Sequence, residues 1–295
     1  MLLTSLLLLL SAAALHAVSN AFLKQASDKL AFAWWMLGVF CVLGTPLIFF
    51  ARSIPMAGWG LAIVSGLLEA VYFFTLGRAY THGDLSVVYP IARGSAPLFL
   101  LLWAAAFLGE KPSPAGLAGI LSIVAGLYLI NLPSLRHWSR PLTGFRTPAT
   151  RWALLTGILI SAYTAVDKVG VRYFSPVVYL YFVLLVCWIA LSVQWLDRER
   201  RIALLNEIKL DPEISAWQSR PAFICGSALL GTTAYTLVLA AMRISPVSYV
   251  GPVREVSVIL GAWIGVRLMG ERGGSLRIAA SILVALGILL IALKG

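Results

Sequence analysis

Apolar residues occur along the chain in long blocks, and short polar or charged segments separate the blocks. Each block has about 20 residues, which is the helix length that crosses the hydrocarbon layer of a bilayer. The pattern therefore predicts an all-α polytopic membrane protein with ten transmembrane helices. Their expected ranges are 2–22, 31–51, 57–80, 85–108, 113–132, 151–172, 176–196, 221–243, 247–268 and 274–293. The first block is interpreted as a helix and not as a signal peptide, because no basic residues precede it.

Polar positions interrupt the apolar block that lies between Gly77 and Gly109. Ser86, Pro90, Arg93 and Pro97 follow one another at positions i, i+4, i+7 and i+11, which places them on one stripe of a helix. Backbone groups freed by proline need partners in protein or water, and an arginine inside the bilayer costs about 2.5 to 3.5 kcal/mol. The stripe is therefore expected to face a substrate cavity and not lipid.

The same pattern occurs a second time, at a nearly constant distance along the chain. Ser248, Pro252 and Ser257 each lie 162 residues after Ser86, Pro90 and Ser95, whereas Gly109-Glu110 returns 161 residues later as Gly270-Glu271. The spacing predicts two copies of one unit, at 1–132 and 151–295, joined by a linker at 133–150. Because five helices per copy is an odd number, the second copy enters the membrane upside down and makes an inverted repeat.

Composition agrees with a membrane protein and excludes several other classes. The chain is 60% hydrophobic and 12% charged, against about 25% charged in soluble domains. The net charge is +11, and the basic residues lie in loops between apolar blocks, where they orient a membrane protein. We therefore do not expect nucleic acid as a partner. The three cysteines lie inside apolar blocks without a CxxC pattern, so neither a disulfide framework nor a metal site is expected. The absence of GxxxxGK[ST], HExxH and GxSxG motifs argues against an ATP-driven pump, a bound cofactor and an enzyme.

The distribution of Lys and Arg predicts the orientation. The side that holds both termini carries 6 of them and the other side carries 15, with Arg93 and Arg254 left out as intramembrane residues. The positive-inside rule then places both termini outside the cytoplasm. On the cytoplasmic side, Ile202, Leu205 and Ile208 recur at helical spacing among charges, which predicts a short helix on the membrane surface.

These features together resemble the EamA-type family of the drug/metabolite transporter superfamily. The residues that carry the resemblance are the repeated Ser and Pro, the two Gly-Glu pairs, and the glycines Gly119, Gly126 and Gly287 in the helices that follow. The resemblance covers nearly the whole chain. It implies a central cavity lined mainly by helices 1, 3, 4, 6, 8 and 9, alternating access, and export of small metabolites from a bacterial inner membrane without ATP.

The charged residues inside the predicted spans are the main site candidates. Arg93 and Glu255 share the 162-residue offset, so the repeat predicts that they approach each other near the midplane. One interpretation is an arginine that exchanges this counter-ion for an anionic substrate, and the other is a structural ion pair. Arg254 points about 100° away from its neighbour on a regular helix, which favours Glu69 as an alternative partner. Glu69 and Glu255 are candidates for proton coupling, with ion pairing as the alternative for Glu69.

Further candidates lie on the same helices. The aromatic residues line the cavity or serve packing, and they are Tyr72, Phe73, Tyr89, Tyr235 and Tyr249. His16 and Asn20, one turn apart, face the cavity or bond between helices. We therefore predict a secondary transporter, an exporter of a small polar or anionic metabolite, with a proton or an anion as counter-ion and the lipid bilayer as its surroundings. A lipid flippase and an intramembrane enzyme are the alternatives.

Overall fold

The computed structural model describes residues 3–51, 54–82, 85–130, 132, 147–209, 220–257, 259–260 and 275–294. Within these ranges every regular element is helical, which confirms the predicted all-α class. The elements are α1 (Leu3–Lys24), α2 (Lys29–Leu43), η1 (Thr45–Ala51), α3 (Met56–His82), α4 (Leu85–Phe107), α5 (Pro114–Ile130), α7 (Pro148–Gly170), α8 (Pro176–Leu191), η4 (Ser192–Leu196), α9 (Arg198–Glu207), α10 (Arg220–Ile244), α11 (Val247–Arg254) and α13 (Ser275–Lys294).

Several of these helices are long and apolar enough to cross a membrane. Five of them meet that test alone in the described part of the chain, and α2 with η1 adds a sixth if the bent pair is one span. Shorter apolar helical stretches lie in α4, α5 and α13. The predicted helix at 247–268 begins as α11, but most of its remainder lies outside the described residues, as does most of the linker at 133–150. A polytopic membrane architecture follows, and the number of ten helices stays a prediction.

The prediction of one continuous helix over 31–51 is wrong. The helix axis bends by 59° between α2 and η1. Pro46 lies just beyond the bend, and proline disfavours helical backbone at the preceding residue and offers no amide to continue the helix. The helix ends at Gly44, whose amide donates to Phe40 O at 2.7 Å.

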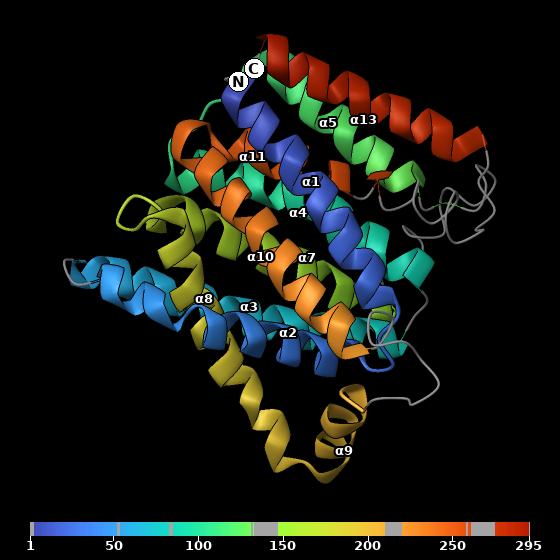
Figure 1. Ribbon diagram of the computed structural model, residues 1–295. Coiled ribbons are helices and arrows are strands. Elements are labelled where there is room, and N and C mark those ends of the chain that lie inside the picture. The colour runs from blue at the N-terminus through green and yellow to red at the C-terminus, as the bar shows by residue number, and fades with distance from the viewer. Residues whose placement is uncertain are drawn as a thin grey trace.

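Helices pair across the two halves of the sequence (Figure 1). α1 lies against α10, α3 against α7, and α5 against α13. Glycines permit the close approach of α5 and α13, because a Cβ at Gly119 would lie 2.7 Å from the carbonyl oxygen of Gly287, and a Cβ at Gly287 would lie 2.6 Å from that of Gly119. Ser122 Oγ also donates to Leu283 O at 2.7 Å between these helices.

The turn after α4 fixes the start of α11. Gly109 has φ +67°, the left-handed conformation that commonly ends a helix, and the Glu110 amide then donates back to Ala104 O at 3.0 Å. The Glu110 carboxylate accepts the amides of Val247 and Ser248, each at 2.9 Å. Glu110 thus has a structural role, while its counterpart Glu271 lies outside the described residues.

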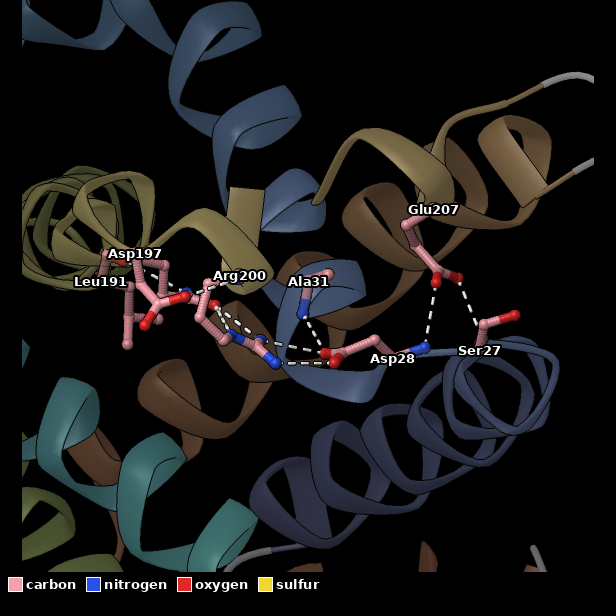
Figure 2. A network of polar contacts seen from close by, with 8 residues as sticks. Ser27, Asp28, Ala31, Leu191, Asp197, Arg200 and Glu207 are labelled. Atoms are coloured by element: carbon pink, nitrogen blue, oxygen red, sulfur yellow. Dashed lines mark hydrogen bonds and ion pairs between the residues drawn. The ribbon is translucent and has the colours of Figure 1, made fainter. Parts of the chain in front are cut away.

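The predicted surface helix is present as α9, and it bonds to the connection between α1 and α2. Figure 2 shows Arg200 donating to both carboxylate oxygens of Asp28, at 2.7 and 3.1 Å. The Glu207 carboxylate accepts the amides of Ser27 at 3.2 Å and Asp28 at 3.0 Å. Trp35 Nε1 donates to Leu204 O at 2.8 Å. We call these contacts the α9 latch.

Asp28 has a second role in the α9 latch, as the N-cap of α2. Its Oδ1 accepts the Ala31 amide at 2.8 Å. Burial raises the pKa of this carboxyl, but the hydrogen bonds from Arg200 and Ala31 outweigh burial, so the pKa lies below its ordinary value. Asp28 is therefore ionised at neutral pH.

Candidate functional site

Two arginines and one glutamate form a buried cluster between α4 and the end of α11. Arg93 Nη1 and Arg254 Nη2 both lie 3.4 Å from Glu255 Oε1. The side chains of Glu255 and Arg254 are only 2% and 6% exposed, whereas that of Arg93 is 25% exposed. The predicted approach of Arg93 to Glu255 is confirmed. We call these three residues the arginine cluster.

The local backbone explains why both arginines reach the same carboxylate. Pro252 lies inside α11, and this helix ends at Arg254. The Glu255 amide then donates to Pro252 O at 3.1 Å, in a tighter turn than a regular α-helix makes. Arg254 and Glu255 therefore bond to each other although they are adjacent in the chain. The alternative pairing of Arg254 with Glu69 is wrong.

The arginine cluster retains unused hydrogen-bonding capacity. Glu255 Oε2 and Arg254 Nε are buried and have no partner among the described residues. A small pocket adjoins them, with room for about one water molecule. Its walls come from three helices, with Pro97 on α4, Ser161 and Thr164 on α7, and Gly251 on α11. Buried polar atoms without a hydrogen bond are unfavourable, so a polar ligand group that bonds to these two atoms gains free energy.

Aromatic side chains surround the arginine cluster. The Arg254 guanidinium lies 5.7 Å from the ring centre of Tyr235, which is a cation–π distance. Tyr235 contacts Tyr163, Tyr163 contacts Tyr72, and Tyr72 contacts Phe73, with ring centres 6.5, 5.9 and 5.0 Å apart. Tyr235 thus lies directly beside Arg254, and Tyr163 connects it to Tyr72 and Phe73, for which the lining of a cavity stays a prediction.

Glu69 is buried on α3, and 7% of it is exposed. The described residues provide it with no hydrogen bond or ion pair within 4.0 Å, so the ion pair weighed as its alternative role is absent from them. Asp167 and Arg254 both act on it electrostatically. Glu69 is therefore near the arginine cluster but not bonded to it.

The remaining predicted residues divide into four groups. Tyr249 is structural, because its hydroxyl accepts the Ser113 amide at 3.0 Å at the start of α5. His16 and Asn20 on α1 are half-buried, and Arg254 and Arg93 both act electrostatically on His16. Ser248 is buried in α11, with its amide on Glu110 and its hydroxyl unpartnered among the described residues. The side chains of three α4 residues lie outside the described part, namely Ser86, Tyr89 and Pro90.

One buried acidic residue was not predicted. Asp167 on α7 is 0% exposed, and its carboxylate accepts hydroxyl groups of Ser65 at 2.5 Å, Tyr179 at 2.9 Å and Tyr235 at 2.5 Å. The signal for it was an acidic residue inside an apolar block. The basic residues directly after it, beginning at Lys168, made this stretch resemble a loop boundary.

Comparison with solved structures supports the fold. One crystal structure of a protein superimposes with a TM-score of 0.68, covering 98% of this chain and 96% of that chain, at 17% sequence identity. At this identity the likeness shows the fold alone.

Comparison of sequences points to transporters. The pseudopaline exporter CntI of Pseudomonas aeruginosa strain UCBPP-PA14 is 25% identical over 199 residues, which cover 66% of this chain and 67% of the exporter. The CntI protein of strain PAO1 gives the same values. The EamA-like transporter family matches twice, at residues 3–132 and 148–293. Because these matches span most of the sequence, the chain belongs to the EamA-like transporter family, whose members are membrane transporters.

Proposed function

We propose that the protein is a secondary active exporter of a small polar or anionic metabolite, and not an enzyme. The observation that carries this proposal is the arginine cluster. It places two guanidinium groups on one carboxylate inside a membrane bundle, with Glu255 Oε2 and Arg254 Nε unpartnered among the described residues beside a pocket. The similarity to CntI, which is named as an exporter, supports the direction of transport.

The proposed binding step is an exchange of anions. A carboxylate or phosphate group of the substrate takes the place of Glu255 at Arg93, which is the more exposed of the two arginines. Guanidinium groups bind such oxyanions through two parallel hydrogen bonds, which are stronger than the 3.4 Å contacts seen here. Tyr72, Phe73 and Tyr235 then supply the apolar walls of the site.

Alternating access follows from the inverted repeat that we propose at 1–132 and 151–295. Two separate matches to the same family support two copies, one in each half. The packing supports them too, because the contact of α1 with α10 corresponds to the contact of α7 with α3 when the halves are exchanged. Rocking of one half against the other would expose the arginine cluster to each side of a bacterial inner membrane in turn.

The α9 latch closes one side in this scheme. It bonds an element of the second half to the α1–α2 connection of the first half. Both termini lie at the far end of the bundle from α9 (Figure 1). With the termini outside the cytoplasm, as we propose, the α9 latch would be cytoplasmic, and its bonds would then support a state closed on that side. Glu69 and Glu255 are our candidates for coupling this cycle to protons.

A binding panel tests the proposal. Purified protein is mixed with acidic, neutral and basic metabolites of similar size, and binding is followed by the shift in thermal unfolding temperature. We expect acidic compounds alone to stabilise the protein, and Arg93→Gln to remove that effect. Arg243→Gln, at an exposed arginine at the end of α10, is the matched control and should bind normally. Stabilisation by cations only would contradict the anion site.

A further inference from the structure

Asp167 is a carboxylate held entirely by hydroxyl groups. Ser65 and Tyr179 donate to Oδ1 and Tyr235 donates to Oδ2, so three different helices surround it. No Lys, Arg or His side chain lies within 4.0 Å of it among the described residues. Lys168, its neighbour in the chain, instead donates to the carbonyl oxygens of Met242 and Ser245. Its charge is thus balanced by hydroxyl dipoles and not by a bonded cation.

The equivalent helix crossing in the other half has no carboxylate. Ser227 lies 162 residues after Ser65, and it faces α1 where Ser65 faces α7. There Ser227 Oγ donates to Ser19 O at 3.1 Å, and Ser19 Oγ donates to Ser227 O at 3.4 Å. Two serines therefore hold the crossing of α1 and α10. Because burying an acid is unfavourable and packing does not require one here, Asp167 is expected to have a function.

The hydroxyl groups around Asp167 accommodate both of its protonation states. A carboxylate accepts three hydrogen bonds from them, as seen here. A carboxylic acid would donate its proton to one hydroxyl oxygen, and that hydroxyl would turn its own hydrogen elsewhere, since Ser and Tyr hydroxyls both donate and accept. Glu255 differs, because its carboxylate contacts two guanidinium groups and not hydroxyl groups.

A single side chain connects Asp167 to the arginine cluster. The Tyr235 hydroxyl bonds Asp167 Oδ2, and the face of its ring lies 5.7 Å from the Arg254 guanidinium. Arg254 in turn contacts Glu255. A change of charge at Asp167 therefore alters the electrostatic environment of Arg254, which contacts Glu255, the counter-ion in the proposed substrate site.

We propose that Asp167 takes up and releases a proton during the transport cycle, and that Tyr235 links its charge to the arginine cluster. This inference rests on the transport function proposed above and names the coupling ion as a proton. On protonation, the proton binds a carboxylate oxygen of Asp167 and no other bond changes. The loss of negative charge at Asp167 weakens its electrostatic attraction for Arg254. The protein with protonated Asp167 and the protein with ionised Asp167 therefore differ in affinity for an anion. Titratable or charged groups near Asp167 on its own and the surrounding elements include Glu69, Tyr72, Arg93, Tyr163, Lys168, Tyr179, Tyr235 and Arg254.

Infrared difference spectroscopy tests the proton site without a known substrate. Protein in lipid vesicles is titrated over roughly pH 4 to 9, and the C=O band of protonated buried carboxyl groups is followed. The wild-type protein should show a titrating band, Asp167→Asn should lose the Asp167 component of it, and the control variant Glu199→Gln, at an exposed carboxylate on α9, should leave that component unchanged. Tyr235→Phe retains Asp167 but removes one donor, so the midpoint should move by about 1 to 2 pH units.

Several results would overturn this role for Asp167. They are a wild-type protein without a titrating band, an unchanged band in Asp167→Asn, or an unchanged midpoint in Tyr235→Phe. Tyr235→Phe also covers the case in which Asp167→Asn does not fold. Failure of the proposed function is distinguished by the metabolite panel, which reports binding at the arginines whether or not Asp167 titrates.

Discussion

Removing the ion pair between Asp28 and Arg200 tests whether the α9 latch stabilises the protein. Asp28→Asn removes the charge but keeps an oxygen that can cap α2, since asparagine is as good an N-cap as aspartate. Arg200→Gln removes the charge from the other side. The double variant completes a thermodynamic cycle, in which effects that belong to only one residue cancel. Among these is the contact of Arg200 with Gln194 at 2.7 Å.

The structure sets the expected size of the effect. The two side chains are 30% and 29% exposed, so the pair belongs with partly solvated ion pairs, which contribute about 0.2 to 1 kcal/mol. Its two parallel hydrogen bonds favour the upper end of that range. We therefore expect a coupling free energy of about 1 kcal/mol. Asp28→Ala also loses the cap and should cost about 1 kcal/mol more than Asp28→Asn.

Unfolding in mixed detergent micelles, followed by circular dichroism, measures these free energies. The coupling should decrease in high salt, because a partly exposed pair is screened. A coupling free energy of zero would show that the α9 latch depends on the backbone bonds of Glu207 and not on Asp28. Equal losses for Asp28→Ala and Asp28→Asn would refute the separate capping contribution.

Three further predictions concern stability. The folded pKa of Asp28 is below its ordinary value of 3.8, so its contribution to stability is fully present above about that pH and is lost as the pH falls through the folded pKa. In this acid range the melting temperature of the wild-type protein should therefore decrease more than that of Asp28→Asn. Glu110→Ala leaves two helix-start amides without their carboxylate and should lower the unfolding free energy by about 1.5 to 3 kcal/mol per lost bond, measured in the same micelles. Gly287→Val should force α5 and α13 apart and lower the melting temperature, whereas Gly60→Val, which meets nothing within 4 Å, should show only a small helix-propensity effect.

Most of the helices could be predicted from the sequence, because length and apolarity are local properties. The predicted range 221–243, for example, corresponds to α10 at Arg220–Ile244. The bend after α2 was missed because the apolar block continues through Gly44 and Pro46. Pro46 ends the helix here, within a block that is continuous by hydrophobicity alone.

The candidate site could be predicted only in part. The 162-residue offset correctly predicted that Arg93 approaches Glu255. The inverted repeat proposed above gives a reason, because positions related by a pseudo-twofold axis face each other near that axis. The predicted direction of the Arg254 side chain, away from Glu255, was wrong because the prediction assumed that a regular helix continues through Glu255. Asp167 was missed because its three hydroxyl partners come from α3, α8 and α10, and no local pattern reports such a meeting.

The two proposed copies carry different charges at positions related by the 162-residue offset. Two identical copies would place like charges at related positions, and two arginines facing each other across the axis would repel in a medium of low dielectric constant. Arginine at 93 and glutamate at 255 turn that repulsion into attraction. Glu69 likewise has Gly231 at the related position, and Ser65 meets Asp167 where Ser227 meets Ser19. With its acids on α3 and α7 and its second arginine on α11, the site is electrically asymmetric, so under the alternating access proposed above the states open to opposite sides of the membrane would differ in energy. Under the proton coupling proposed above, this asymmetry would give a single bound proton different effects in the two states.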